Sequence, residues 1–215
     1  MKQPSISDFF TGDVLPEKTY LVYGEDKAGK TSLALTTAAK TAARGMKTMW
    51  IDCGARLSPL RLKQIIPDKF LDKIYVTQPR GFREQLTSIL NIHDFLPSDV
   101  SLIVVDDFTN LHRLELTGKP SIDLPVYRAL SLQAALLKNI ATTRKTAVII
   151  IGLVHEIPVI NVTTPVAQRI VTYWTDLVAK TTRQNNKYVI EEEKPANRKI
   201  FYKITEKGVE ILPGF

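Results

Sequence analysis

Residues 24–31 have the spacing G-x-x-x-x-G-K-[ST] of a phosphate-binding loop, and this motif constrains the fold more than any other part of the chain. An apolar run, 19–23, precedes it, and a stretch rich in Ala and Leu, 32–44, follows it. A phosphate loop joins a buried strand to a helix, because its backbone N–H groups and the positive end of the helix together bind the anion. This order of segments predicts an α/β fold.

Each position of the motif has a chemical reason. Gly24 and Gly29 let the backbone wrap a phosphate chain, Lys30 is expected to reach the β- and γ-phosphates, and the Thr31 hydroxyl is expected to bind Mg²⁺. We therefore predict a site for ATP and Mg²⁺. The predicted nucleotide-binding residues of the loop are Gly24, Glu25, Asp26, Lys27, Ala28, Gly29, Lys30, Thr31 and Ser32. The alternative, a glycine turn with an incidental lysine, does not explain the flanking strand and helix.

A nucleotide-bound Mg²⁺ also needs a carboxylate, which usually lies at the end of an apolar strand. The apolar run 102–105 ends in Asp106 and Asp107. Asp106 is the predicted metal ligand beside Thr31. Three roles remain open for Asp107, namely a local hydrogen bond, a cap of the following turn, or a catalytic base. The predicted catalytic residues are Lys30, Asp106 and Asp107.

ATP hydrolysis requires one further carboxylate, which orients and deprotonates the attacking water. The expected strand 47–51 is followed by Asp52, but position 54 is glycine and no glutamate is nearby. Asp52 either ties down the end of this strand or acts in catalysis, and we favour the first interpretation. The sequence therefore predicts nucleotide binding without predicting a strong ATPase.

Candidate strands and helices alternate along the chain, which indicates βαβ units and a mostly parallel sheet flanked by helices. The expected strands are 19–23, 47–51, 74–77, 102–105 and 147–152, and the expected helices are 32–44, 59–66, 81–95 and 127–143. Two segments, 111–125 and 155–168, are expected to be loops. The C-terminal third is expected to form antiparallel strands at 177–183, 188–192 and 199–204.

The length of 215 residues and a hydrophobic content of 44% suit a single domain, residues 1–215. The chain has no apolar run of membrane-spanning length and no signal peptide at its start, so we expect a cytoplasmic protein without membrane contact. Cys53 is the only cysteine, which excludes an internal disulfide. A net charge of +7 suits a polyanion such as nucleic acid, although many soluble enzymes are equally basic.

Three further segments resemble the RecA/RadA recombinase superfamily, and most closely the short archaeal RadA paralogs of the RadB and RadC type. Residues 50–62 are similar, without a gap, to the family segment YIDTEGTFRPERL. Residues 102–107 resemble LIVVDS, and residues 201–210 resemble the C-terminal strand FRITEKG. The resemblance covers nearly the whole chain and implies a RecA-like P-loop ATPase core, with a mostly parallel central sheet and antiparallel C-terminal strands.

The resemblance also implies roles for individual positions. Lys30, Thr31 and Asp106 match the family's ligands of ATP and Mg²⁺. Arg61 matches an arginine that lies against the adenine, so it joins the predicted nucleotide-binding residues. Pro195 falls where the family has a proline segment that can cap the nucleotide of a neighbouring subunit. The two expected loops, 111–125 and 155–168, fall where recombinases carry their DNA-binding loops.

The chain departs from the family at two catalytic positions. The family's catalytic glutamate is Gly54 here, and its Asn-Gln pair, which senses the γ-phosphate, falls on Gly152 and Leu153. None of these side chains can polarise water or hydrogen-bond a phosphate. His155 is the nearby candidate substitute, although a polar loop histidine is the simpler interpretation. We expect weak ATP hydrolysis at most.

The segments by which recombinases of the family polymerise are not expected in this chain either. Only 23 residues precede Gly24, which leaves no room for the helix-hairpin-helix domain and the linker phenylalanine motif of recombinases. Phe9 and Phe10 are expected to pack onto the core rather than to imitate that motif. Self-polymerisation into a strand-exchange filament is therefore not expected.

Two functional hypotheses follow. The first is an ATP-binding paralog that binds single-stranded DNA modestly and modulates the main recombinase during repair. The second is a nucleotide-dependent interaction subunit without DNA contact, and a small-molecule kinase is a weaker third. The candidate DNA contacts are the basic residues His112, Arg113, Lys119, Arg169, Lys180, Arg183, Lys187, Arg198 and Lys199, with Tyr173 and Trp174 as possible stacking platforms.

Overall fold

In a computed structural model, the described part of the chain is residues 3–157, 162–184 and 187–213, and side chains are not described at 155–164. The strands are β1 (Thr19–Gly24), β2 (Lys47–Asp52), β3 (Ile74–Thr77), β4 (Val100–Asp106), β5 (Ala147–Ile157), β6 (Val162–Pro165), β7 (Leu177–Gln184), β8 (Lys187–Lys194), β9 (Arg198–Thr205) and β10 (Gly208–Ile211). The helices are α1 (Ser7–Thr11), α2 (Lys30–Ala43), α3 (Pro59–Ile65), α4 (Phe82–Phe95), α5 (Asn110–Glu115), α6 (Pro120–Thr143) and α7 (Gln168–Tyr173), with a 3₁₀ helix at Asp68–Lys73.

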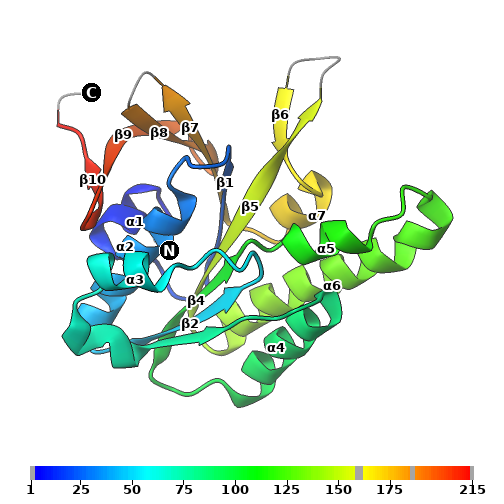
Figure 1. The fold of residues 1–215 in the computed structure, drawn as a ribbon, viewed down its shortest axis with the longest axis horizontal. Coiled ribbons are helices and arrows are strands. Elements are labelled where there is room, and N and C mark those ends of the chain that lie inside the picture. The colour runs from blue at the N-terminus through cyan, green and yellow to red at the C-terminus, as the bar shows by residue number, and fades with distance from the viewer. Residues whose placement is uncertain (1–2, 158–161, 185–186, 214–215) are drawn as a thin grey trace.

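The described strands form one mixed sheet in the order β10-β9-β8-β7-β1-β5-β4-β2-β3, and β6 pairs with β5 (Figure 1). All pairs from β7 to β3 along this order are parallel. The pairs from β7 to β10 are antiparallel. The predicted fold class is thus confirmed. One detail differs from the prediction: β7 is antiparallel only toward β8, because on its other side it extends the parallel sheet.

Helices cover both faces of the sheet, and side chains alternate between the two cores along each strand. In β1, Tyr20 and Val22 face the core beneath α1, α2 and α3, whereas Leu21 and Tyr23 face the core beneath α4, α5, α6 and α7. Figure 1 shows these two groups of helices on opposite sides of the sheet. Both faces are apolar, so a one-residue slip in the register of β1 would exchange the two sets of side chains.

The prediction that residues 111–125 form a loop is wrong. Its first part lies in α5 and its last part forms the first turns of α6. Pro120 is in the first turn of α6, where its missing N–H breaks no hydrogen bond. The carboxylate of Asp123 accepts hydrogen bonds from the backbone N–H groups of Thr117 (2.8 Å) and Gly118 (2.9 Å), which holds the turn before the helix. Gly118 and Pro120, which suggested a loop, instead mark a helix start, and Pro125 lies inside the helix.

The expected loop 155–168 is also largely wrong. The strand predicted to end at 152 continues to Ile157 as β5 and pairs with β6, so that Val154 lies opposite Pro165. Residues 168–173 form α7. Residues 158–161 of the expected loop lie outside the described part of the chain.

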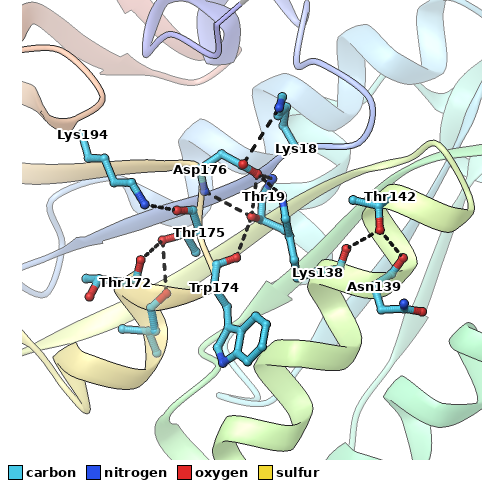
Figure 2. Close-up of polar contacts among 11 residues, drawn as sticks. Lys18, Thr19, Lys138, Asn139, Thr142, Thr172, Trp174, Thr175, Asp176 and Lys194 are labelled. Atoms are coloured by element: carbon cyan, nitrogen blue, oxygen red, sulfur yellow. Dashed lines mark hydrogen bonds and ion pairs between the residues drawn. The ribbon is translucent and has the colours of Figure 1, made fainter.

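A cluster of hydrogen bonds at the amino end of β1 joins three elements (Figure 2). Asp176, just before β7, accepts hydrogen bonds from the backbone N–H (2.8 Å) and the hydroxyl (2.9 Å) of Thr19. The same carboxylate forms an ion pair with Lys138 of α6. These contacts fix the start of β1 against β7 and α6.

The N-terminal phenylalanines pack into the core, as predicted. Phe9 is fully buried and its ring contacts Tyr20 edge to face at 5.4 Å, while Phe10 contacts Tyr202 in the same way at 5.6 Å. Short α1 thereby covers α2 and the β1 face. Separately, no helix in the described residues is long and apolar enough to cross a bilayer.

We predict that Phe9→Ala lowers the free energy of unfolding by about 3–5 kcal/mol, because it removes a buried aromatic side chain and leaves a cavity. The matched control is Phe95→Ala at the end of α4, where the side chain is 80% exposed and little should change. Denaturant unfolding followed by circular dichroism measures both. Equal losses in the two variants would contradict the packing role of Phe9.

Candidate nucleotide-binding site

The phosphate loop lies at the carboxyl edge of the sheet and is shaped by the C-terminal strands. A Cβ atom at Gly24 would overlap the carbonyl oxygen of Thr181 in β7, so only glycine permits this approach. Gly29 has φ +85°, and a Cβ there would lie 2.6 Å from Cδ1 of Ile204 in β9. The Tyr202 hydroxyl donates a hydrogen bond to the carbonyl of Ala28 (2.6 Å). The loop is therefore held from outside by β7 and β9.

Lys30 begins α2, and its ammonium group lies inside the loop. It donates hydrogen bonds to the carbonyl oxygens of Gly24 (2.8 Å) and Glu25 (2.6 Å), and its side chain is almost completely buried. Burial lowers the pKa of Lys30, while the carboxylates of Asp107 and Asp26 act in the opposite direction. A cation is thus held where the loop would surround a phosphate.

The structure brings the two predicted metal ligands together. The Thr31 hydroxyl donates a hydrogen bond to Oδ2 of Asp106 at 2.7 Å. Burial raises the pKa of Asp106 to about 6, against the effect of the Thr31 hydrogen bond and with a further increase from Asp107. A buried carboxylate beside a hydroxyl is a donor set of the kind that Mg²⁺ prefers, so these residues fit the ion.

Asp107 follows directly and has one carboxylate oxygen engaged. Oδ1 accepts hydrogen bonds from the backbone N–H and the hydroxyl of Thr109, both at 3.2 Å. Oδ2 is buried and has no hydrogen-bond partner among the described residues. Burial raises the pKa of Asp107 as well. The local hydrogen bond and the turn cap are therefore both present, and a role as catalytic base stays a prediction.

A cavity of about 430 Å³ connects these groups. It is lined by Asp26, Lys27, Gly29, Lys30, Thr31, Ser32, Arg56, Asp106, Asp107, Ile151, Leu153 and Ile204. Eight of these were predicted from the sequence, and the other four are Arg56, Ile151, Leu153 and Ile204. Gly24, Glu25 and Ala28 belong to the same loop but do not line the cavity.

The family of this chain follows from comparison with known proteins. The family model of the RecA N-terminal domain matches residues 11–205. The chain belongs to the RecA family. It is similar to the DNA repair and recombination protein RadB of Methanococcus maripaludis, with 26% identity over 214 residues that cover 96% of this chain and 97% of that protein.

Two other RadB proteins are similar over comparable lengths. The protein of Methanocaldococcus jannaschii is 28% identical over 197 residues, covering 89% of this chain and 92% of that protein. The protein of Thermococcus kodakarensis is 28% identical over 218 residues, covering 96% of each. The predicted relationship, to archaeal RadB-like paralogs within the RecA/RadA superfamily, is confirmed.

Arg61, which the family resemblance assigns to the adenine, connects three elements beside the cavity. Its guanidinium donates hydrogen bonds to the carbonyl oxygens of Thr205 (2.8 Å) and Glu206 (3.1 Å) and to the Ser32 hydroxyl (3.2 Å). It does not line the cavity itself, but Ser32 does. Contact between Arg61 and an adenine therefore remains a prediction.

The two departures from the family's catalytic pattern both lie at this edge of the sheet. Asp52 accepts hydrogen bonds from the backbone N–H groups of Arg56 and Leu57, both at 3.1 Å, which supports its interpretation as a structural residue. The N–H of Gly54 donates to the carbonyl of Asp106 at 3.2 Å. Leu153 places an apolar side chain on the cavity wall. The side chain of His155 lies outside the described residues.

One predicted DNA contact, His112, is wrong. Its side chain is 1% exposed, and its ring packs edge to face against Phe82 (5.6 Å) and Tyr127 (4.9 Å). Burial lowers the pKa of His112 to about 4, so the ring is neutral at pH 7. It faces inward because 111–125 is helical rather than a loop. Arg113 and Lys119 on the same segment are exposed.

The remaining candidate DNA contacts differ in how far they are exposed. Arg169 is exposed at α7, and Tyr173 is exposed and contacts Trp174 edge to face at 4.9 Å. Trp174 packs partly against the core beneath α6. On the C-terminal strands Lys199 pairs with Glu191 at 2.9 Å, and Arg198 donates to the Ser5 hydroxyl at 3.0 Å. Lys180 has a half-buried side chain, whereas Arg183 and Lys187 are exposed.

We predict that His112 makes the protein sensitive to acid. Because burial lowers its pKa from 6.5 to about 4, the unfolded chain takes up a proton between these pH values while the native state does not. The contribution of His112 to the free energy of unfolding should therefore fall as pH decreases through this window, by up to about 3 kcal/mol. The raised pKa values of Asp106 and Asp107 act in the opposite direction, so the effect of the histidine is the difference between the native protein and a variant without it.

The variant His112→Phe keeps both ring contacts and should remove this loss. His93→Phe, at a partly exposed histidine of α4, is the control and should retain it. Urea unfolding between pH 7.5 and 4.5 measures the effect. Parallel pH profiles for the native protein and His112→Phe would contradict the assignment.

Proposed function

We propose that this chain is an ATP-binding RecA-family paralog that binds single-stranded DNA modestly and modulates the main recombinase in homologous recombination and DNA repair. Family membership and the repair and recombination names of its relatives support this role. The observation that carries the proposal is the convergence of Lys30, Thr31 and Asp106 on one cavity. The proposal treats residues 1–215 as one domain and keeps the cytoplasmic location expected from the sequence.

The loop 24–29 and Lys30 would hold the phosphates, and Thr31 and Asp106 would hold Mg²⁺. When bound, the ion neutralises phosphate charge. The protein's own contribution is to keep the ammonium of Lys30 in a buried position and to support the loop through Tyr202. A site built mainly to bind and orient can use ATP as a structural ligand or a slow switch.

Weak hydrolysis follows from the chemistry of the cavity. The catalytic glutamate of the family is replaced by glycine, and losing a positioned general base costs a factor of about 10²–10⁴ in rate. Asp107, with its unpartnered buried Oδ2, is the carboxylate that could activate water in part. We assign it this role within the proposal, beside its structural hydrogen bonds to Thr109.

Replacing the loop lysine tests the nucleotide site. Lys30→Ala should weaken Mg-ATP binding by a factor of at least about 10, because it removes a charge-assisted contact to the phosphates. Lys40→Ala, at an exposed position of the same helix, is the control and should bind normally. Titration calorimetry measures both variants. Unchanged binding by a folded Lys30→Ala variant, or no binding by the native protein, would remove the proposal.

Binding to single-stranded DNA is tested by gel-shift titration across salt concentrations. The double variant Arg113→Glu/Lys119→Glu should bind more weakly and show a shallower salt dependence, since phosphate contacts release counterions. The control is the double variant Lys63→Glu/Lys69→Glu, which changes the net charge by the same amount at exposed positions of α3 and the 3₁₀ helix. It should bind DNA as the native protein does. Absence of binding by the native protein at low salt would remove DNA from the proposal.

One observation favours the second function, a nucleotide-dependent interaction subunit. Where DNA-contacting loops were expected, α5 and the start of α6 expose the large apolar side chains Leu114, Ile122 and Leu124. Clusters of exposed apolar side chains often mark protein contacts. Co-purification from native extract with a DNase control separates the functions, because a partner retained after DNase treatment is held by protein contacts.

A further inference from the structure

Arg56 is a basic residue of the cavity that the family pattern does not include. It lies between β2 and α3 and lines the same cavity as Lys30, Thr31 and Asp107. Its guanidinium contacts Oδ1 of Asp26, in the phosphate loop, at 3.1 Å. The two side chains are 49% and 69% exposed, so the pair lies on the open side of the cavity.

The backbone of Arg56 is held in place by the carboxylate of Asp52. Its N–H donates a hydrogen bond to Oδ1 of buried Asp52 at 3.1 Å, and the N–H of Leu57 donates to Oδ2 of the same carboxylate at 3.1 Å. Asp52 thus anchors the turn that carries Arg56. The backbone of Arg56 is therefore held, whereas its long side chain can exchange Asp26 for another partner at the cavity.

The side chain of Arg56 also lies over Gly54. A Cβ atom at Gly54 would be 3.3 Å from Cγ and 3.4 Å from Cδ of Arg56. The similar family segment has glutamate at position 54 and threonine at position 56. This chain therefore lacks a carboxylate where the family has its water-activating group, and an arginine side chain occupies the adjoining volume. The local charge changes from negative to positive.

The guanidinium is close enough to act on the groups around the phosphate site. Its positive charge lowers the pKa of Lys30 and that of Asp107, although burial is the largest influence on both. Its present partner is an exposed carboxylate, and such pairs are weak. A terminal phosphate carries more charge and accepts two parallel hydrogen bonds from a guanidinium, so it is the stronger partner.

We propose that Arg56 binds the γ-phosphate of ATP and makes the site prefer ATP to ADP, with Asp26 holding the guanidinium when no nucleotide is bound. This inference rests on the proposed nucleotide site. An arginine stays protonated and cannot accept a proton from water. The substitution of position 54 by glycine and the arginine two residues later together convert a site for cleaving ATP into one for retaining it.

The test compares the dissociation constants of Mg-ATP and Mg-ADP by titration calorimetry. Arg56→Ala should weaken ATP binding by a factor of about 10 or more and change ADP binding less than about 2-fold, as expected for loss of a charge-assisted hydrogen bond to the γ-phosphate alone. Arg56→Lys, which keeps the charge without the planar pair of donors, should lose an intermediate amount. Asp26→Asn should bind ATP more tightly because the competing carboxylate is removed.

The control is Arg44→Ala. Arg44 forms an ion pair of similar exposure, 49% and 52%, with Asp13 at 2.6 Å, and it does not line this cavity. This variant should keep the native ratio of ATP to ADP affinity. If Arg56→Ala binds both nucleotides as the native protein does, or weakens both equally, the γ-phosphate contact is overturned while the nucleotide site stands. If the native protein binds neither, the proposed function itself fails.

Discussion

The burial of β1 between two parallel neighbours is the constraint on which the rest of the structure depends. β1 pairs with β5 on one side and β7 on the other, and all its residues are buried. Apolar cores on both faces set its register, and Asp176 fixes its start through Thr19. β1 ends at Gly24, and a short loop leads from it into α2 at Lys30. The phosphate loop is the consequence of where this strand ends.

The same arrangement links the C-terminal strands to the site. Asp106 reaches Thr31 because β4 and β1 both flank β5 and their carboxyl ends meet at one edge. On the other side, Tyr202 and Thr181 contact the loop from β9 and β7. The loop is thus held between the central sheet and the antiparallel extension. A displacement of β7 or β9 would reach the phosphate loop directly, which gives a physical path between the C-terminal strands and the candidate nucleotide site.

Most of the architecture could be predicted because strands buried on both faces are continuous apolar runs, as in 102–105 and 147–152. The errors have a common cause. Pro120, Gly118 and Pro125 are typical of loops, but Asp123 caps the turn and α6 packs against the sheet, so the segment is helical. His112 was placed on the surface for the same reason. Arg56 was missed because a single arginine in a turn belongs to no motif. The glycine at position 54, where the family has glutamate, was a usable signal that this part of the site differs from the family.

The amino-acid sequence by itself determined the phosphate-loop motif, the predicted metal carboxylate and the family, because these are read from residue types at short, fixed spacings. Tertiary structure alone decided which groups support the loop and which line the cavity. Tyr202 contacts Ala28 across 174 positions of the chain, and Arg56 meets Asp26 across 30. The burial of a histidine and the charge around the candidate phosphate site depend on which distant segments fold over them. Short spacings in the sequence do not contain that information.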